Sequence, residues 1–389
     1  MTRLDTDWIR DTGPRAVLDA LCDAGFEAYY VGGAVRDALL GRAVTDIDVA
    51  TNAPPDAVTA AMDGAGLKTI ATGIEHGTVT VLSGMPVEVT TYRRDVATDG
   101  RRATVAFSET LAEDAARRDF TLNALYADRD GAVIDPLGGL EDLRAGKVRF
   151  IGDASLRIRE DGLRVLRFFR FFAHYSPAGS APDEQGFAAI AAAGDALRPV
   201  SRERIGAEMT KLLAAPDPGV AVQSMAGAGV LQAALPGADP GVLPRLIAVE
   251  QAEGVTPDWR CRLACLGGDT PLESLRLSRR DGATLTAMAE VRASATPLEV
   301  VAEMKGADIA TQGALLRAAD GQALPEDWRT RIAKGAAACF PLSAADLIGH
   351  YGEGPALGAA LAALRAAWRD SGFTLDRDAL LEIDSRARV

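Results

Sequence analysis

Two aspartates stand two residues apart in the segment TDIDVAT, residues 45–51. If this segment is a strand, its side chains alternate between two faces. Ile47 and Val49 then enter a core. Asp46 and Asp48 then share the opposite face, where two close carboxylates repel each other unless a cation lies between them. Because such oxygen ligands suit Mg²⁺, Asp46 and Asp48 are candidate catalytic residues and metal ligands. Plain solvent exposure of both side chains is the alternative.

A third carboxylate is available on a predicted hairpin, HGTVTVLSGMPVEVTTYR (76–93), which turns at SGMP. Its second strand places Val87 and Val89 on one face and Glu88 on the other. If that strand lies beside TDIDVAT, Glu88 reaches the same metal ions and is a further catalytic candidate. A glutamate on an edge strand that faces water has the same pattern.

Upstream of the aspartates, VGGAVRDALLG (31–41) places two glycines where a predicted strand gives way to a helix. Gly32 and Gly33 let backbone N–H groups approach a phosphate closely, and the helix that follows points its N-terminus in the same direction. Arg36 follows three residues after Gly33 and could reach the same phosphates. A tight turn with a surface pair of Arg36 and Asp37 is the alternative.

The elements that must position these residues alternate between helix and strand over the first 150 residues. Helices are expected over 14–25, at AVRDALLG and at PPDAVTAAMDGAG, with strands at EAYYVGG and TDIDVAT. From about residue 155 onward, Ala, Leu and Arg recur at helical spacing, as in GPALGAALAALRAAWR. The layout therefore predicts an α/β head followed by a long helical remainder.

Composition limits the class of protein. The 389 residues are 48% hydrophobic and 25% charged, and they hold four cysteines, which suits a globular protein of a reducing compartment. No segment approaches the roughly 20 apolar residues that span a bilayer, so we expect a soluble, cytoplasmic protein. The net charge of -12 argues at first against nucleic acid. Arginines nevertheless cluster at 93–102, at 117–118 and in RIREDGLRVLRFFR, which would suit a basic groove.

Five segments together resemble the class II tRNA nucleotidyltransferase and bacterial poly(A) polymerase family. In chain order they are VGGAVRDALLGRAVTDIDVAT (31–51), RRDFTLNALY (117–126), DPLGGLEDL (135–143), EDGLRVLRFFRF (160–171) and SRERIGAEMTKLL (201–213). Each one alone is a weak signal, but the set in this order is specific. The resemblance implies an α+β nucleotidyltransferase head with a small mixed or antiparallel sheet over 1–150. A helical neck over 151–215 and a helical body and tail over 216–389 would follow.

The resemblance also implies an activity, namely two-metal nucleotidyl transfer onto an RNA 3′-hydroxyl, with two Mg²⁺ ions held by Asp46 and Asp48. The expected substrates are ATP, CTP and the acceptor arm of tRNA, with no membrane and no obligate protein partner. The expected nucleotide-binding residues are Gly32, Gly33, Arg36, Arg117, Arg118, Asp119, Asn123, Asp161, Arg164, Arg167 and Arg170. Without the motif, the run from Arg117 to Asp119 reads as a solvated cluster of charges.

The fourth segment bears on the choice of nucleotide. Residues 160–170 read as a helix in which Asp161 and Arg164 stand three apart. By the resemblance, these two side chains act as an amino-acid template for the base. Asp accepts and Arg donates, which complements the amino group and ring nitrogen of cytosine and adenine. Uracil and guanine present the reverse pattern and would leave polar groups unpaired. A simple salt bridge between the two side chains is the alternative.

Three activities share these motifs: full CCA addition, partial addition of CC or A, and polyadenylation. The polar segment TYRRDVATDGRRATVAFSETLAEDAARRDF (91–120) resembles the flexible loop that complete CCA-adding enzymes retain. An ordinary surface loop is the alternative. We therefore expect CCA addition, with a poly(A) polymerase or a partial CC- or A-adding enzyme as alternatives. A catalytically silent tRNA-binding protein is an alternative of a different class.

Overall fold

The computed structural model describes residues 2–73, 77–98 and 103–387. The chain divides into two compact units. The first comprises Met1–Ala238 and Asp269–Arg276, and the second comprises Asp239–Gly268 and Leu277–Val389. None of the helices within the described residues has the length and apolar character that crossing a bilayer requires.

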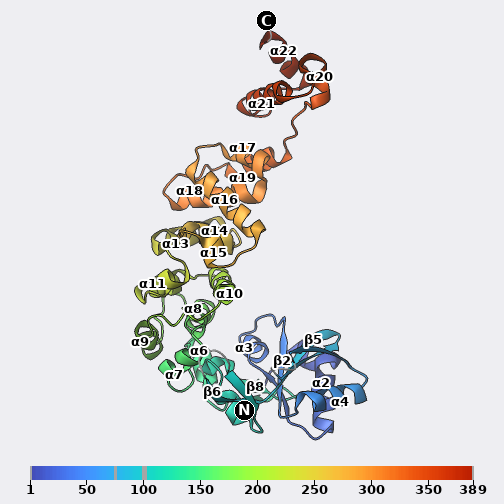
Figure 1. The fold of residues 1–389 in the computed structure, drawn as a ribbon, viewed down its shortest axis with the longest axis vertical. Coiled ribbons are helices and arrows are strands. Elements are labelled where there is room, and N and C mark those ends of the chain that lie inside the picture. The colour runs from blue at the N-terminus through green and yellow to red at the C-terminus, as the bar shows by residue number, and fades with distance from the viewer. Residues whose placement is uncertain (1, 74–76, 99–102, 388–389) are drawn as a thin grey trace. The chain divides into compact units, whose positions relative to one another are not determined.

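A mixed sheet forms the centre of the head (Figure 1). Within the described residues its strand order is β3-β4-β5-β2-β1-β8-β9. The pairing of β2 with β5 is parallel, and the other neighbouring strands are antiparallel. This confirms the predicted mixed sheet. The strands are β1 (Ala28–Val31), β2 (Ile47–Thr51), β3 (Lys68–Gly73), β4 (Thr78–Ser83), β5 (Met85–Thr91), β8 (Tyr126–Ala127) and β9 (Val133–Ile134).

The two faces of this sheet differ in polarity. Ile47 and Val49 of β2 are buried, and helices α2 (Thr12–Asp23) and α4 (Pro55–Gly64) pack against strands of the sheet (Figure 1). Across β2, β5 and β4, Asp48 is the register partner of Glu88, and Glu88 is the partner of Thr80. Register partners share a face, so the polar row lies opposite the apolar one. The alternation expected from TDIDVAT and PVEVTTY is therefore present.

The predicted loop over 91–120 is wrong for most of its length. The described part of this segment forms an antiparallel pair of strands, β6 (Arg93–Thr98) and β7 (Ala103–Phe107), followed by a short helix. The residues between these strands lie outside the described part of the chain. Alternating Val, Thr and Ala favour strands. The loop prediction did not take this local preference into account. The remaining head elements are α1 (Asp7–Arg10), α3 (Gly33–Leu39), α5 (Leu111–Ala116), η2 (Thr121–Asn123) and α6 (Gly139–Ala145).

Helices follow the head, as predicted, but the helix expected over 160–170 is broken. The first of two helices ends at Glu160, and the second begins at Arg164. Between them Asp161 is extended, with φ −149° and ψ 106°. A Cβ on Gly162 would lie 1.8 Å from the Ala196 carbonyl oxygen, so the backbone approaches another segment too closely for any residue but glycine. The helices of this part are α7 (Ala154–Glu160), α8 (Arg164–Tyr175), α9 (Glu184–Ala192), α10 (Arg202–Leu213), α11 (Gly219–Gly227), α12 (Val230–Ala234) and α15 (Pro271–Ser274).

Aromatic side chains fasten α8 to the head. The ring of Phe168 lies 5.6 Å from that of Phe150, which in turn lies 4.9 Å from that of Phe120. All three residues are buried. Because a helix repeats every 3.6 residues, this packing leaves the arginines at 164, 167 and 170 on an adjoining side of α8.

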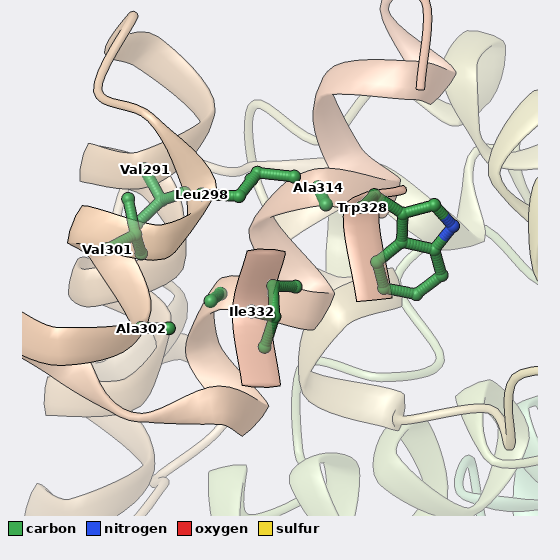
Figure 2. Packing of buried hydrophobic residues seen from close by; sticks show 8 residues of the cluster. Val291, Leu298, Val301, Ala302, Ala314, Trp328 and Ile332 are labelled. Carbon is green, nitrogen blue, oxygen red and sulfur yellow. The ribbon is translucent and has the colours of Figure 1, made fainter. Parts of the chain in front are cut away.

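The second unit is helical and has its own core. Figure 2 shows Val291, Leu298 and Trp328 among the residues that pack together there. Cys261 and Cys265 are buried and free. The helices are η3 (Pro240–Val242), α13 (Leu243–Glu253), α14 (Trp259–Leu266), α16 (Arg279–Ala293), α17 (Leu298–Lys305), α18 (Ala307–Ala319), α19 (Trp328–Ala337), α20 (Ala344–Tyr351), α21 (Pro355–Asp370) and α22 (Arg377–Ala387).

Candidate active site

A cavity of about 440 Å³ in the first unit gathers most of the candidate residues. This volume is in the range of small-molecule binding sites. Asp48 and all of the predicted nucleotide-binding residues line it, whereas Asp46 and Glu88 are not among the lining residues. The lining residues are Gly32, Gly33, Arg36, Asp48, Arg117, Arg118, Asp119, Asn123, Asp161, Arg164, Arg167, Arg170 and Phe171.

Four stretches of the chain meet at this cavity: the turn between β1 and α3, residues 117–123, the region from Asp161 through α8, and Asp48 of β2. At the turn, Gly32 has φ +67°, a conformation that strains other residues. A Cβ there would lie 3.5 Å from the guanidinium of Arg118. That distance is an ordinary contact, so the positive φ rather than a lack of space favours glycine at this turn.

Asp114 binds Arg117 and Arg118, the two arginines at the start of the 117–123 stretch. Its side chain is 1% exposed, and its carboxylate lies 2.6 Å from Nη2 of Arg117 and 2.8 Å from Nη2 of Arg118. The hydroxyl of Tyr126 donates to the same carboxylate at 2.9 Å. Burial opposes ionisation of Asp114, but the two guanidinium groups keep its pKa below the ordinary value. Arg117 and Arg118 are therefore fixed at the cavity rather than being a loose surface cluster.

A chain of hydrogen bonds crosses the cavity from Arg36 to Arg167. The guanidinium of Arg36 donates to the side-chain oxygen of Asn123, whose amide nitrogen donates to Asp119 at 2.8 Å. The other oxygen of Asp119 accepts from Nε of Arg167 at 2.7 Å. Burial raises the pKa of Asp119, but Arg167 outweighs this effect and the net shift is downward. Asn123 and Asp119 thus orient two arginines from different parts of the chain.

Phe171 and Glu208 contact arginines that line the cavity. The guanidinium of Arg170 lies 4.3 Å from the centre of the Phe171 ring, and that of Arg36 lies 5.1 Å from it. Such contacts attract a cation to the ring face. Glu208 of α10 accepts from Nε of Arg170 at 2.6 Å and lies 3.7 Å from Nη1 of Arg167.

Asp161 and Arg164 do not form the salt bridge considered as an alternative. Arg164 instead pairs with Glu160, four residues earlier across the break between α7 and α8, and donates to the Arg157 carbonyl oxygen at 2.9 Å. Asp161 accepts from Nη2 of Arg204 at 2.7 Å. Each member of the predicted base-reading pair therefore has a separate partner.

The electrostatics of the cavity favour an anionic ligand with a polar edge. Its described lining includes six arginines and three aspartates. The arginines are also paired with carboxylates, but each guanidinium has five N–H donors. The ion pairs described above use only part of these donors. The cavity can therefore bind phosphate oxygens with guanidinium groups and can offer Asp161 as a hydrogen-bond acceptor.

Three carboxylates lie at one edge of the cavity. Asp48 is half-buried on β2, with Glu88 beside it on β5 and Asp46 just before the strand. Burial, Glu88 and Asp46 raise the pKa of Asp48, and Arg118 and Arg36 offset this only in part. Negative charge is therefore concentrated at this edge without full compensation.

Comparisons with known proteins agree on one family. The chain matches models described as "Poly A polymerase head domain" over residues 28–149 and "Probable RNA and SrmB- binding site of polymerase A" over residues 181–241. A crystal structure of a Bacillus stearothermophilus CCA-adding enzyme in complex with CTP is 30% identical, with a TM-score of 0.73, and the match covers 97% of each chain. The chain belongs to the class II tRNA nucleotidyltransferase and bacterial poly(A) polymerase family.

Other members of this family are similar over part or all of the chain. A CCA-adding enzyme of Geobacillus thermodenitrificans (strain NG80-2) is 44% identical over 216 residues, which is 55% of this chain and 52% of that enzyme. The matched region thus spans about half the length of such curated relatives. An apo structure of a CCA-adding enzyme has a TM-score of 0.75 at 20% identity, covering 100% of this chain and 97% of the other, and shows the shared fold.

The acidic edge of the cavity suits the divalent metal ions that nucleotidyltransferases of this family generally use. Among the described residues, no three His, Cys, Asp or Glu side chains converge as a complete metal site. An incomplete set of carboxylates fits a divalent ion that keeps several coordination positions for water and substrate phosphates. The uncompensated charge around Asp48 is the observation that supports this fit.

Several residues that shape the site were not identified from the sequence. Asp114 stands three and four residues before Arg117 and Arg118, and this helical spacing was the available signal. Glu160 stands four residues before Arg164 in the same way. The contacts that α10 makes join residues far apart in the sequence, so its partners had no local signal.

Proposed function

We propose that this protein adds CMP and AMP from CTP and ATP to the 3′ end of tRNA, building or repairing the CCA terminus. The observation that carries the proposal is the cavity in which guanidinium groups, Asp48 and the pair of Asp161 and Arg164 meet. The reaction joins the RNA 3′-oxygen to the α-phosphorus of the nucleotide and releases pyrophosphate. The similarity to enzymes named for CCA addition supports the same assignment.

In this proposal the arginines hold the triphosphate and the sugar. Arg117 and Arg118 are fixed by Asp114, and Arg36 is fixed by Asn123. Groups held in advance lose little freedom when a ligand binds, and they favour a charged transition state over the ground state. Asp119 serves mainly as the counter-ion that orients Arg167. Gly32 and Gly33 leave room for the phosphates at the turn.

The base is selected by Asp161 and Arg164. A carboxylate that only accepts and a guanidinium that only donates match the amino group and ring nitrogen of cytosine and adenine. With uracil or guanine, an acceptor would face an acceptor and a donor would face a donor, at the cost of unpaired polar groups. The separation of these side chains from each other in this structure supports the role.

Asp46 and Asp48, with Glu88 nearby, would hold two Mg²⁺ ions. When bound, the ions lower the pKa of the 3′-hydroxyl and offset the negative charge that develops on pyrophosphate. The carboxylates themselves fix the metal edge beside the nucleotide, because Ile47 and Val49 anchor their strand in the core.

The helical remainder is proposed to bind the tRNA acceptor arm. We retain the division into a head to residue 150, a neck over 151–215 and a body and tail over 216–389 as part of this proposal. The free cysteines suit a reducing compartment, and we propose that the protein acts in the cytoplasm without an obligate protein partner.

A nucleotide incorporation assay tests this proposal. Purified protein and Mg²⁺ are incubated with tRNA transcripts that end before CCA, after C and after CC, and each NTP is supplied separately. We expect CMP on the first two transcripts and AMP on the third. Long A-tails on unrelated RNA would instead indicate a poly(A) polymerase. No incorporation on any transcript would indicate a silent tRNA-binding protein.

A further inference from the structure

The side chain of Asp161 is held from outside its own helices. Its backbone is extended between α7 and α8, so helical geometry does not fix the direction of the side chain. Two contacts do so instead. The Leu163 backbone N–H donates to Oδ1 at 3.1 Å, and Nη2 of Arg204 donates to Oδ2 at 2.7 Å. Each oxygen of the carboxylate thus has one fixed donor and keeps a lone pair for a ligand.

Arg204 belongs to a helix that supports the cavity at two points. It lies in the first turn of α10, and Glu208 follows one turn later on the same helix. Glu208 binds Arg170, which also lines the cavity. Residues four apart lie on one face of a helix. This face of α10 therefore places a cation, Arg204, beside Asp161. It also places an anion, Glu208, beside Arg170.

Stability alone does not account for the pair of Arg204 and Asp161. The side chains are 52% and 32% exposed, and ion pairs at such exposure contribute little to folding because water and salt screen them. Arg204 is not among the residues that line the cavity. Arg204 instead contacts Asp161, the side chain that accepts a hydrogen bond from the base in the proposed function.

We propose that Arg204 is a positioning residue for nucleotide selection. This inference rests on the proposed base-reading role of Asp161. Arg204 holds the Asp161 carboxylate in one rotation, so that its remaining lone pair meets an amino group of cytosine or adenine. Without Arg204, the carboxylate turns away or adapts to other edges. A hydrogen bond weakens steeply when its donor and acceptor lose their alignment.

Steady-state kinetics with matched variants test this role. Arg204→Gln removes the charge, Arg204→Lys keeps a charge that can reach an anion, and Arg202→Gln is the control. Arg202 is exposed on the same turn of α10 and donates to the Ala233 carbonyl oxygen. Incorporation of CMP and UMP is measured on a tRNA transcript that ends before CCA, together with the melting temperature of each variant.

We expect Arg204→Gln to raise KM for CTP and to lower the ratio of kcat/KM for CTP over UTP by roughly tenfold. Arg204→Lys should recover part of the ratio, and Arg202→Gln should match the wild-type protein. All melting temperatures should stay close to the wild-type value. In the double variant with Asp161→Asn, the Arg204→Gln change should add no further loss, because Arg204 acts through Asp161.

Two results would overturn the inference while leaving the proposed function intact. In the first, Asp161→Asn lowers the CTP/UTP ratio but Arg204→Gln does not. In the second, kcat/KM for CTP rises in Arg204→Gln, which would make Arg204 an obstacle to the nucleotide. An unchanged ratio in Asp161→Asn would reject the base-reading role itself, and the inference with it.

Discussion

Asp48 combines a proposed function with a cost to folding. Its carboxylate is half-buried, lies near two other acids, and has a raised pKa because of burial and Glu88. We predict that Asp48→Asn lowers nucleotide transfer by more than about 100-fold, since loss of even an outer partner of a metal ligand costs 10- to 100-fold. Without added metal, the variant should unfold at the same temperature as the wild-type protein or at a higher one.

Transfer assays and thermal melting of metal-free protein test this prediction. Asp63→Asn serves as the control, because Asp63 is exposed on α4. Retention of transfer by Asp48→Asn, or a clear fall in its melting temperature, would contradict the assigned role.

Asp114 is expected to matter for stability in a manner that depends on pH. Asp114→Asn leaves Arg117 and Arg118 without their buried partner and should lower the free energy of unfolding by about 3 kcal/mol. The pKa of the folded carboxyl lies below the ordinary value of about 3.9. Its stabilising effect is therefore complete above that value and is lost as the pH falls through the folded pKa.

Urea unfolding of the wild-type and Asp114→Asn proteins between pH 7 and pH 3 measures this effect. The difference between them should be constant near neutral pH and should shrink below about pH 4. Glu109→Gln is the control, since Glu109 is exposed in the same segment. A difference that grows on acidification has the wrong sign for this account.

The proposed selection of the base depends on the junction between α7 and α8. Gly162→Ala would put a Cβ 1.8 Å from the Ala196 carbonyl oxygen, so the junction must shift. We expect a loss of about 1–3 kcal/mol in stability and a higher KM for CTP, because Asp161 is the preceding residue. Gly64→Ala, which meets open space at the end of α4, should change neither quantity appreciably. Unchanged kinetics in Gly162→Ala would show that selection tolerates movement of the junction.

The local elements could be predicted because their signals are local. The alternation in TDIDVAT and PVEVTTY is enough to predict β2 and β5, and the two glycines before Arg36 predict the turn into α3. The sequence predicted that Glu88 lies near Asp48 if the two strands are neighbours. The structure shows that β2 and β5 are paired in parallel, with Asp48 opposite Glu88.

The break at Asp161 could not be predicted in the same way. It follows from the approach of Gly162 to Ala196, a contact between separate segments. The partners of the cavity arginines are equally dependent on tertiary packing. Glu208 and Arg204 stand in a recognised motif, but their spacing does not say which side chain of α8 or of the preceding junction each one meets.

At the scale of the molecule, nucleotide binding should reside in the first unit alone. Every residue that lines the cavity belongs to that unit. Trp328 is 4% exposed in the core of the second unit, and Trp328→Ala should cost about 3–5 kcal/mol there. We expect calorimetry to show earlier melting of the second unit while the affinity for CTP stays unchanged.

Met304→Ala is the matched control for Trp328→Ala, because Met304 is 53% exposed in the same unit. It should leave both the melting profile and the affinity for CTP unaltered. A fall in CTP affinity in Trp328→Ala would mean that the second unit contributes to nucleotide binding.

The most direct test of the proposed CCA addition is the nucleotide sequence that the protein adds to the 3′ end of RNA. A tRNA transcript lacking CCA is incubated with the protein, Mg²⁺ and all four NTPs together, and the 3′ ends are sequenced. The account predicts that most ends gain C, C and A in that order, with U and G absent despite their presence in the mixture. Frequent U or G, or long tracts of A, would contradict selection of cytosine and adenine by one pair of side chains.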